Sequence, residues 1–143
     1  FTPADQPFVI GKAITMNEGC DVTIVATGHL VWPALQAAQI LSQKGVSAEV
    51  IDIHTIKPLD EEAILSSANK TRAVVTAEEH SCNGGLGDAV CQLLGRKLPT
   101  PVEMVAVNDK FGESGTSMQL MNEYHLNADA IVESSLKAIA RKN

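Results

Sequence analysis

Aromatic and basic residues are both scarce in this chain. Phe, Trp and Tyr together make up 3% of its 143 residues, too few for the stacking surfaces that hold single-stranded nucleic acids. The 11 Lys and Arg residues are scattered and outnumbered by 17 Asp and Glu residues, which gives a formal net charge of −6. Such a chain lacks the basic surface that binds DNA, RNA or an anionic membrane. We therefore expect no nucleic acid and no membrane among its partners.

Long apolar runs are missing too. No stretch approaches the ~20 apolar residues that span a bilayer, and no basic and apolar leader opens the sequence. The P-loop pattern G-x-x-x-x-G-K-[ST] is absent. The absence of a membrane-spanning stretch and of a leader predicts a cytoplasmic protein. The first residue is Phe1 instead of Met, so we expect a processed product or a part of a longer protein.

Cysteine is rare and shows no pairing pattern. Cys20, Cys82 and Cys91 are odd in number and form no C-x-x-C motif, which favours reduced thiols in a cytosolic protein. A zinc site built from His80, Cys82 and Cys91 is an alternative that the ligand spacing disfavours.

The sequence does contain a regular alternation of strand and helix patterns, and 45% of its residues are hydrophobic. We expect a linker at residues 1–10 and one domain at residues 11–143. The predicted strands lie at 10–16, 21–27, 46–53, 73–77 and 102–107, and the helices at 30–43, 60–68, 86–94, 116–121 and 127–139. This alternation indicates an α/β fold with a mostly parallel sheet covered on both faces. The first strand need not share the direction of the others.

Residues 71–94 are predicted to form a strand, a glycine turn and a helix, which together make one half of a parallel α/β unit. A buried strand is predicted to end at Ala77, so that residues 78–80 (EEH) emerge into solvent. Gly84, Gly85 and Gly87 then supply a turn where Cβ atoms would clash, and an amphipathic helix follows. In open parallel sheets, ligands and partners gather at the carboxyl ends of strands.

Two motifs in the chain resemble nucleotide or catalytic signatures. Residues 85–90 (GLGDAV) fit G-x-G-x-x-G except at Val90, and Asp109 follows at the distance of a ribose-binding acid. Residues 112–116 (GESGT) approach a nucleophile elbow, but the second glycine comes one place early. We interpret the first as a glycine turn that starts a helix, and Ser114 as a capping or turn residue.

His29, His54 and His80 each follow a predicted strand, so we expect them at one edge of the sheet. With Glu78 and Glu79 they could form an acid/base or metal cluster, although exposed loop histidines are commoner and an interdomain contact fits equally well. We assign no catalytic, cofactor-binding or metal-binding residue. The candidate interface or ligand edge comprises Gly28, His29, His54, Glu79, His80, Gly84, Gly85 and Gly87.

Four motifs in this order suggest a family: residues 21–28 (DVTIVATG), 57–60 (KPLD), 78–90 (EEHSCNGGLGDAV) and 111–115 (FGESG). From about Gly11 to its C-terminus, the chain closely resembles the C-terminal domain of transketolases. The same domain closes 1-deoxyxylulose 5-phosphate synthase and the β-subunits of 2-oxo acid dehydrogenases. Residues 111–115 and 124–126 favour transketolase, especially its split form.

Transketolases transfer two-carbon ketol units between sugar phosphates with thiamine diphosphate and a divalent cation such as Mg²⁺. The resemblance implies a three-layer α/β/α sandwich whose five-stranded mixed sheet has the order 1-3-2-4-5, with strand 1 antiparallel. It also implies a non-catalytic domain that packs on the pyrimidine-binding middle domain or subunit. The whole enzyme would be a homodimer or an oligomer of split subunits.

The family's cofactor motif is incomplete in this chain. Transketolases hold the diphosphate and metal through Gly-Asp-Gly and a later Asn, whereas Gly87 and Asp88 are followed by Ala89. The carboxylate that activates thiamine belongs to the middle domain. We therefore expect no cofactor in this segment and no activity from it alone. A hypothesis of another class is a small-molecule or regulatory site at the carboxyl edge.

Overall fold

The computed structural model describes residues 4–108 and 114–143. In chain order, the described elements are β1 (Ile14–Asn17), β2 (Val22–Ala26), the 3₁₀ turn η1 (Gly28–Leu30), α1 (Val31–Gln43), β3 (Ala48–Asp52), α2 (Glu61–Thr71), β4 (Val74–Ser81), α3 (Leu86–Lys97), β5 (Val102–Val107), α4 (Ser117–Glu123) and α5 (Ala128–Ala140). The predicted succession of strands and helices is confirmed.

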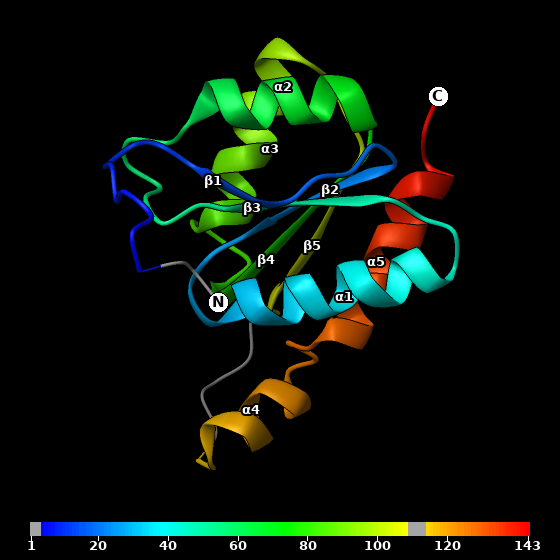
Figure 1. Ribbon diagram of the computed structural model, residues 1–143. Coiled ribbons are helices and arrows are strands. Elements are labelled where there is room, and N and C mark those ends of the chain that lie inside the picture. The colour runs from blue at the N-terminus through cyan, green and yellow to red at the C-terminus, as the bar shows by residue number, and fades with distance from the viewer. Residues whose placement is uncertain (1–3, 109–113) are drawn as a thin grey trace.

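The strands form one five-stranded sheet with the order β1-β3-β2-β4-β5 (Figure 1). β2 pairs in parallel with β3 and β4, and β4 pairs in parallel with β5. β1 is antiparallel to β3. The strand order and the reversed first strand are those implied by the resemblance.

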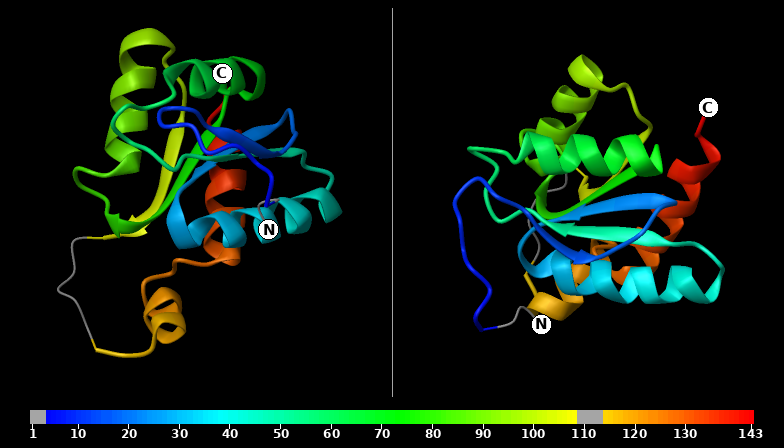
Figure 2. Two further views of the ribbon diagram at one scale, coloured as in Figure 1. Left: turned by 60° about the vertical axis from the view of Figure 1, so that its left-hand side comes forward. Right: turned by 45° about the horizontal axis from the view of Figure 1, so that its top comes forward.

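Helices cover both faces of this sheet, which makes three layers. α1 and α5 lie on one face and α2 and α3 on the other (Figures 1 and 2). Alternating side chains of β2 enter different cores, because Ile24 packs beneath α1 and α5 whereas Val25 packs beneath α2 and α3. The buried residues of both core clusters are Ala, Val, Ile and Leu, and burying an aliphatic side chain of the size of Val or Ile contributes roughly 1.5–3 kcal/mol.

Several predicted helix ends are confirmed. Gly45 follows α1 with a φ of +78°, Asp60 accepts a hydrogen bond from the Ala63 amide, and Thr116 forms a capping box with Gln119. Other predicted boundaries differ, among them those of α3 and β1. α3 continues past Gly95 to Lys97, so its basic residues lie in the last turn, and β1 begins at Ile14 because residues 9–12 form a turn. Within the described residues, no helix is both long and apolar enough to cross a bilayer.

Near the start of β3, at the amino end of the parallel strands, the buried carboxylate of Glu49 lies beside Lys70. Burial raises the pKa of Glu49, but hydrogen bonds from Lys70, Ser67 and the Gly19 amide outweigh it and leave that pKa below its ordinary value. A carboxyl group whose pKa is lower in the folded than in the unfolded chain stabilises the fold at pH values above its unfolded-state pKa. This contribution is lost as the pH falls through its folded-state pKa.

We expect Lys70→Met to destabilise the fold most near neutral pH. Without the ammonium group, burial dominates and the pKa of Glu49 rises. The difference in unfolding free energy between the variant and the parent should shrink as the pH falls through the lowered pKa of Glu49 in the parent, because Glu49 is then protonated in both proteins. Urea unfolding across this range measures it, and a difference independent of pH would contradict the assignment.

Candidate functional site

The carboxyl half of β4 sends neighbouring side chains to opposite faces of the sheet, because strand side chains alternate. Glu79 points toward His29, at the start of the helical layer that contains α1. Glu78 points toward the start of α3, and His80 Nδ1 lies 3.8 Å from its Oε1. The EEH motif is therefore divided between two faces and does not form one cluster.

Glu78 is the most unusual polar residue of this edge, since its side chain is completely buried. Its Oε1 accepts a hydrogen bond of 2.9 Å from the Leu86 amide, and its Oε2 accepts one of 2.7 Å from the Gly87 amide. These amides belong to the first turn of α3, where unpaired N–H groups and the helix dipole favour an anion. The carboxylate of Glu78 thus occupies the place that a phosphate takes at other helix N-termini.

The glycines of the following turn make this contact possible. A Cβ atom at Gly85 would lie 1.9 Å from Glu78 Oε1, and one at Gly87 would lie 2.5 Å from Met104 Sδ. Gly84 has open space around it, but its φ of +82° favours glycine, and its amide donates to Asp88 Oδ2 at 2.6 Å. The predicted Cβ clash is confirmed at Gly85 and Gly87. At Gly84 the prediction of a clash is wrong, and the positive φ is what favours glycine there.

His29 and Glu79 form an exposed pair on the other face. His29 Nδ1 lies 2.6 Å from Glu79 Oε2, and the two side chains are 74% and 34% exposed. Gly28 beside them has a φ of +59°, and a Cβ there would lie 3.2 Å from Glu79 Oε1. The pair has the proximity of an acid/base couple, but its exposure makes it a weak ion pair.

Replacing His29 with alanine should lower the free energy of unfolding by less than about 1 kcal/mol, because an exposed ion pair contributes little. Thermal or urea unfolding measures this value. A loss of several kcal/mol would show that the pair holds the turn before α1 in place, which its exposure does not predict.

His54 has yet other partners. Its Nε2 donates to the Val9 carbonyl at 3.1 Å, and its ring centroid lies 4.4 Å from that of Phe8. The Gly11 amide donates to Thr55 Oγ1 at 2.9 Å. The N-terminal segment is thereby held along the carboxyl edge of the sheet.

The cluster hypothesis for the three histidines is therefore wrong, since each histidine contacts different residues. His80 also lies inside β4 instead of after it. Among the residues that the structure describes, no group of three or more His, Cys, Asp and Glu side chains could hold a metal ion. The alternative zinc site of His80, Cys82 and Cys91 does not form.

The sequence pattern also predicted that Glu78 lies in solvent, and this prediction is wrong. β4 continues to Ser81 because β5 extends beside it through a register shift, with Ser81 opposite Val107. Glu78 thereby continues the row of side chains from Val74 and Thr76 that faces α3. A glutamate in phase with a buried row, just before a double glycine, is the signal that could have identified it.

The structure describes the nucleotide-like motif at residues 85–90 in full and the elbow-like motif at residues 112–116 in part. Val90 is fully buried against the sheet, and the helix amides that would receive a pyrophosphate are bonded to Glu78. These observations support the interpretation as a glycine turn. Asp109 and two residues of the elbow-like motif, Gly112 and Glu113, lie outside the described residues.

The same geometry tests whether these residues could hold thiamine diphosphate. The Asp88 carboxylate accepts a hydrogen bond from the Gly84 amide through Oδ2. The Gly87 amide donates to Glu78 Oε2 at 2.7 Å. The Gly87 amide is therefore not open to a diphosphate.

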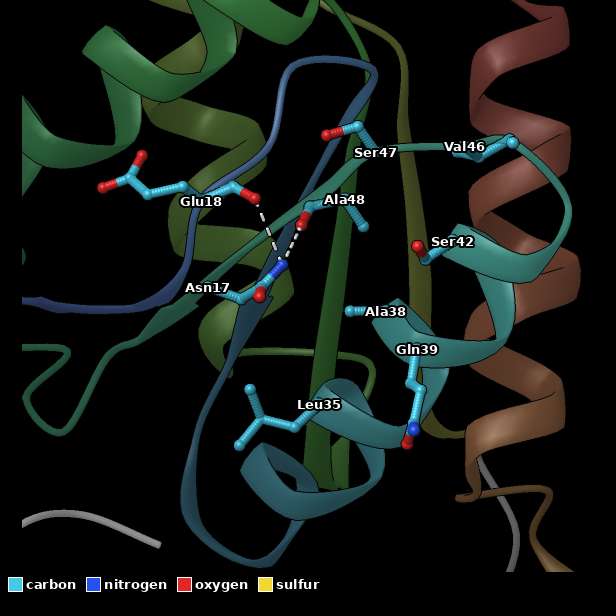
Figure 3. A pocket seen from close by; sticks show the side chains of 10 residues that line it. Asn17, Glu18, Leu35, Ala38, Gln39, Ser42, Val46, Ser47 and Ala48 are labelled. Atoms are coloured by element: carbon cyan, nitrogen blue, oxygen red, sulfur yellow. Dashed lines mark hydrogen bonds between the residues drawn. The ribbon is translucent and has the colours of Figure 1, made fainter.

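One cavity lies away from this edge, between the end of β1 and α1, with a volume of about 590 Å³ (Figure 3). Asn17 contributes a polar group to it, but its Nδ2 donates to the carbonyls of Ala48 at 2.7 Å and Glu18 at 3.2 Å. Glu18 is the charged residue of its lining. The side-chain nitrogen of Asn17 thus ties the end of β1 to β3.

Sequence comparison identifies the family. The profile described as "Transketolase, C-terminal domain" matches residues 11–131. A 6-deoxy-6-sulfo-D-fructose transketolase subunit of Clostridium sp. (strain MSTE9) is 49% identical over 97% of this chain and 43% of its own length. An apulose-4-phosphate transketolase subunit of Phocaeicola vulgatus is 39% identical, over 96% of this chain and 44% of its own. A 1-deoxy-D-xylulose-5-phosphate synthase of Halothermothrix orenii is also 39% identical, over 91% of this chain and 21% of its own.

Solved structures agree with these relatives. A split-gene transketolase in an inactive beta4 tetramer superposes with a TM-score of 0.96 and 45% identity, covering 99% of this chain and 46% of that one. A transketolase variant from Pichia stipitis has a TM-score of 0.67 at 18% identity, covers 91% of this chain and 18% of that one, and so supports the fold alone. The chain spans less than half the length of the transketolase subunits that it matches. From the profile and these relatives, the chain belongs to the transketolase C-terminal domain family.

Proposed function

We propose that this chain is the non-catalytic C-terminal domain of a transketolase-type thiamine diphosphate enzyme. The enzyme transfers two-carbon ketol units between sugar phosphates, in the cytoplasm and in pentose phosphate metabolism. The domain packs on the pyrimidine-binding domain or subunit of the same enzyme. It also supports the homodimer or split-subunit oligomer in which the active sites form.

The observation that carries this proposal is the match along 97% of the chain to a transketolase subunit more than twice its length. The contacts of Glu78 support it from the structure. Its carboxylate occupies the α3 N-terminus, so the glycine turn serves to join α3 to the sheet and the amides of Leu86 and Gly87 are not open to a phosphate. Reactive groups then have to come from the remainder of the enzyme.

A ketol-transfer assay tests the proposal. The 143-residue chain, supplied with thiamine diphosphate, Mg²⁺ and a panel of ketose and aldose phosphates, should give no turnover. The full-length protein encoded by the gene, or the chain combined with its thiamine-binding subunit, should turn over. Turnover by the chain alone would overturn the assignment as a non-catalytic domain.

A second candidate is the C-terminal domain of a 1-deoxyxylulose 5-phosphate synthase, which the 39% identity to the enzyme of Halothermothrix orenii favours. The higher identity to a transketolase subunit, 49%, places transketolase first. The full-length protein distinguishes the two by its product. Formation of 1-deoxyxylulose 5-phosphate in place of a transferred ketol unit would replace the first candidate with the second.

A further inference from the structure

Met104 lies in the middle of β5, the strand at one edge of the sheet. It is 41% exposed, although its side chain lies on the face of the sheet that α3 covers. Its Sδ and Cγ lie 2.5 and 3.1 Å from the point where a Cβ of Gly87 would lie, so the thioether packs on the first turn of α3. Met104 is therefore both in contact with α3 and accessible to a small solute.

Thr76 is the direct neighbour of Met104 in the sheet. The Cα atoms of the two residues are partners in the register between β4 and β5, so their side chains lie side by side on the same face. The side chain of Thr76 is completely buried, and its Oγ1 lies 3.1 Å from the same Cβ position of Gly87 that Met104 Sδ approaches. The hydroxyl and the sulfur thus border the same small space beside the backbone of Gly87.

The Thr76 hydroxyl differs from other buried hydroxyls in its bonding. Among residues 4–108 and 114–143, Thr76 Oγ1 is the one buried side-chain oxygen or nitrogen without a hydrogen-bond partner. On the same face of the sheet, Thr23 Oγ1 lies 2.6 Å from Ser67 Oγ and 2.7 Å from Thr71 Oγ1. A buried donor without an acceptor is destabilising, and the thioether beside Thr76 is only a weak acceptor. An oxygen atom bound to the sulfur of Met104 would be a strong acceptor for this hydroxyl.

We propose that Met104 is a site of reversible oxidation by a peroxide, and that its sulfoxide oxygen accepts the hydrogen bond that Thr76 Oγ1 lacks. A lone pair of the sulfur attacks one oxygen of hydrogen peroxide, so the S–O bond forms as the O–O bond breaks. The departing hydroxide takes the proton of the transferred oxygen and leaves as water. The sulfur thereby loses two electrons, which the peroxide gains. A methionine sulfoxide reductase reverses the step, because two thiols supply two electrons and two protons and the oxygen leaves as water.

The position of Met104 decides what its oxidation does to the fold. At Met118, which is 75% exposed on α4, a sulfoxide oxygen would be solvated by water and needs no partner in the protein. At Met104 the same oxygen enters the contact between β5 and α3, and a polar atom added to an apolar contact normally disrupts it. The Thr76 hydroxyl offsets this disruption because it supplies the missing donor. The contact with α3 therefore tolerates oxidation of Met104 as long as Thr76 is present.

Treatment of the 143-residue chain with hydrogen peroxide tests the role of Thr76. Met16, Met118 and Met121 are first replaced with leucine, which cores tolerate in place of methionine, so that Met104 is the one methionine left. Urea unfolding then measures how far oxidation lowers the unfolding midpoint. We expect this shift to be about twofold larger, or more, in Thr76→Val than in the parent, because valine keeps the volume and removes the hydroxyl.

Thr76→Ser is the matched control, since it keeps the hydroxyl and should show the shift of the parent. Thr76→Val should fold when reduced, because it replaces an unpaired buried hydroxyl with a methyl group. Equal shifts in the parent and in Thr76→Val would show that Thr76 does not hold the oxygen and would overturn the proposal.

The full-length protein with its native methionines tests whether the site is accessible and reversible. Under limiting hydrogen peroxide, mass spectrometry of its peptides should find the sulfoxide at Met104 in the folded protein, at a rate within about tenfold of that at the more exposed Met118. Methionine sulfoxide reductases A and B together should then remove the oxygen. Met104 that stays reduced while Met118 is oxidised, or a sulfoxide at Met104 that the two reductases leave in place, would contradict the proposal.

Discussion

Glu78→Ala is expected to lower the free energy of unfolding by roughly 3–5 kcal/mol, because it leaves two buried amides without an acceptor. These amides, of Leu86 and Gly87, lie at the start of α3, and each donates to one oxygen of the carboxylate. The substitution also removes the anion that opposes the helix dipole. Urea unfolding followed by circular dichroism measures the loss.

Two further variants define the origin of this loss. Glu78→Gln keeps the volume but places an N–H₂ group against one of the amides, so we expect an intermediate loss. Glu62→Gln is the control, because this glutamate in the first turn of α2 has an 88% exposed side chain and its replacement should cost less than about 1 kcal/mol. A stability of Glu78→Ala equal to that of the parent would mean that the carboxylate does not anchor α3.

Gly85→Ala should destabilise the domain by about 2–3 kcal/mol, since overpacking a filled site costs energy of this size. The added Cβ would lie 1.9 Å from Glu78 Oε1, so the carboxylate must leave the α3 amides or the turn must move. Gly95→Ala is the matched control in α3. Nothing lies within 4 Å of its Cβ position, so this change should stabilise the helix by roughly 0.5–1 kcal/mol.

The substitutions Glu78→Ala and Gly85→Ala should also be coupled. Once the carboxylate is removed, the Cβ added at position 85 no longer meets it, and the cost of adding that Cβ should fall. A double-mutant cycle is expected to give an interaction energy of at least about 1 kcal/mol. Additive losses would show that Gly85 is required for a reason other than contact with Glu78.

The fold could be predicted from the sequence where local chemistry decides it. β2 is a fully buried run, and the caps at Asp60, Thr116 and Asn127 each bond an amide three residues ahead. The strand order and the reversed β1 depend on pairing across the chain. They came from the family resemblance, because alternation of helices and strands does not determine the order of strands in a sheet.

The candidate site was harder to predict. The sequence placed His29, His54 and Glu79 at the carboxyl edge, which the structure confirms, but not the face toward which each side chain points. For Glu78 the face depends on the continuation of β4 past Ala77 to Ser81, because the alternation of strand side chains then keeps Glu78 in the buried row. An open groove between the start of α1 and α4 was missed because its lining comes from segments far apart in the chain.

Titration calorimetry of the chain with thiamine diphosphate and Mg²⁺ measures most directly whether cofactor chemistry resides in these residues. Because Glu78 holds the α3 amides and Asp88 is bonded to Gly84, we predict no saturable heat. Saturable binding of one cofactor per chain, abolished by Asp88→Ala, would contradict a non-catalytic domain.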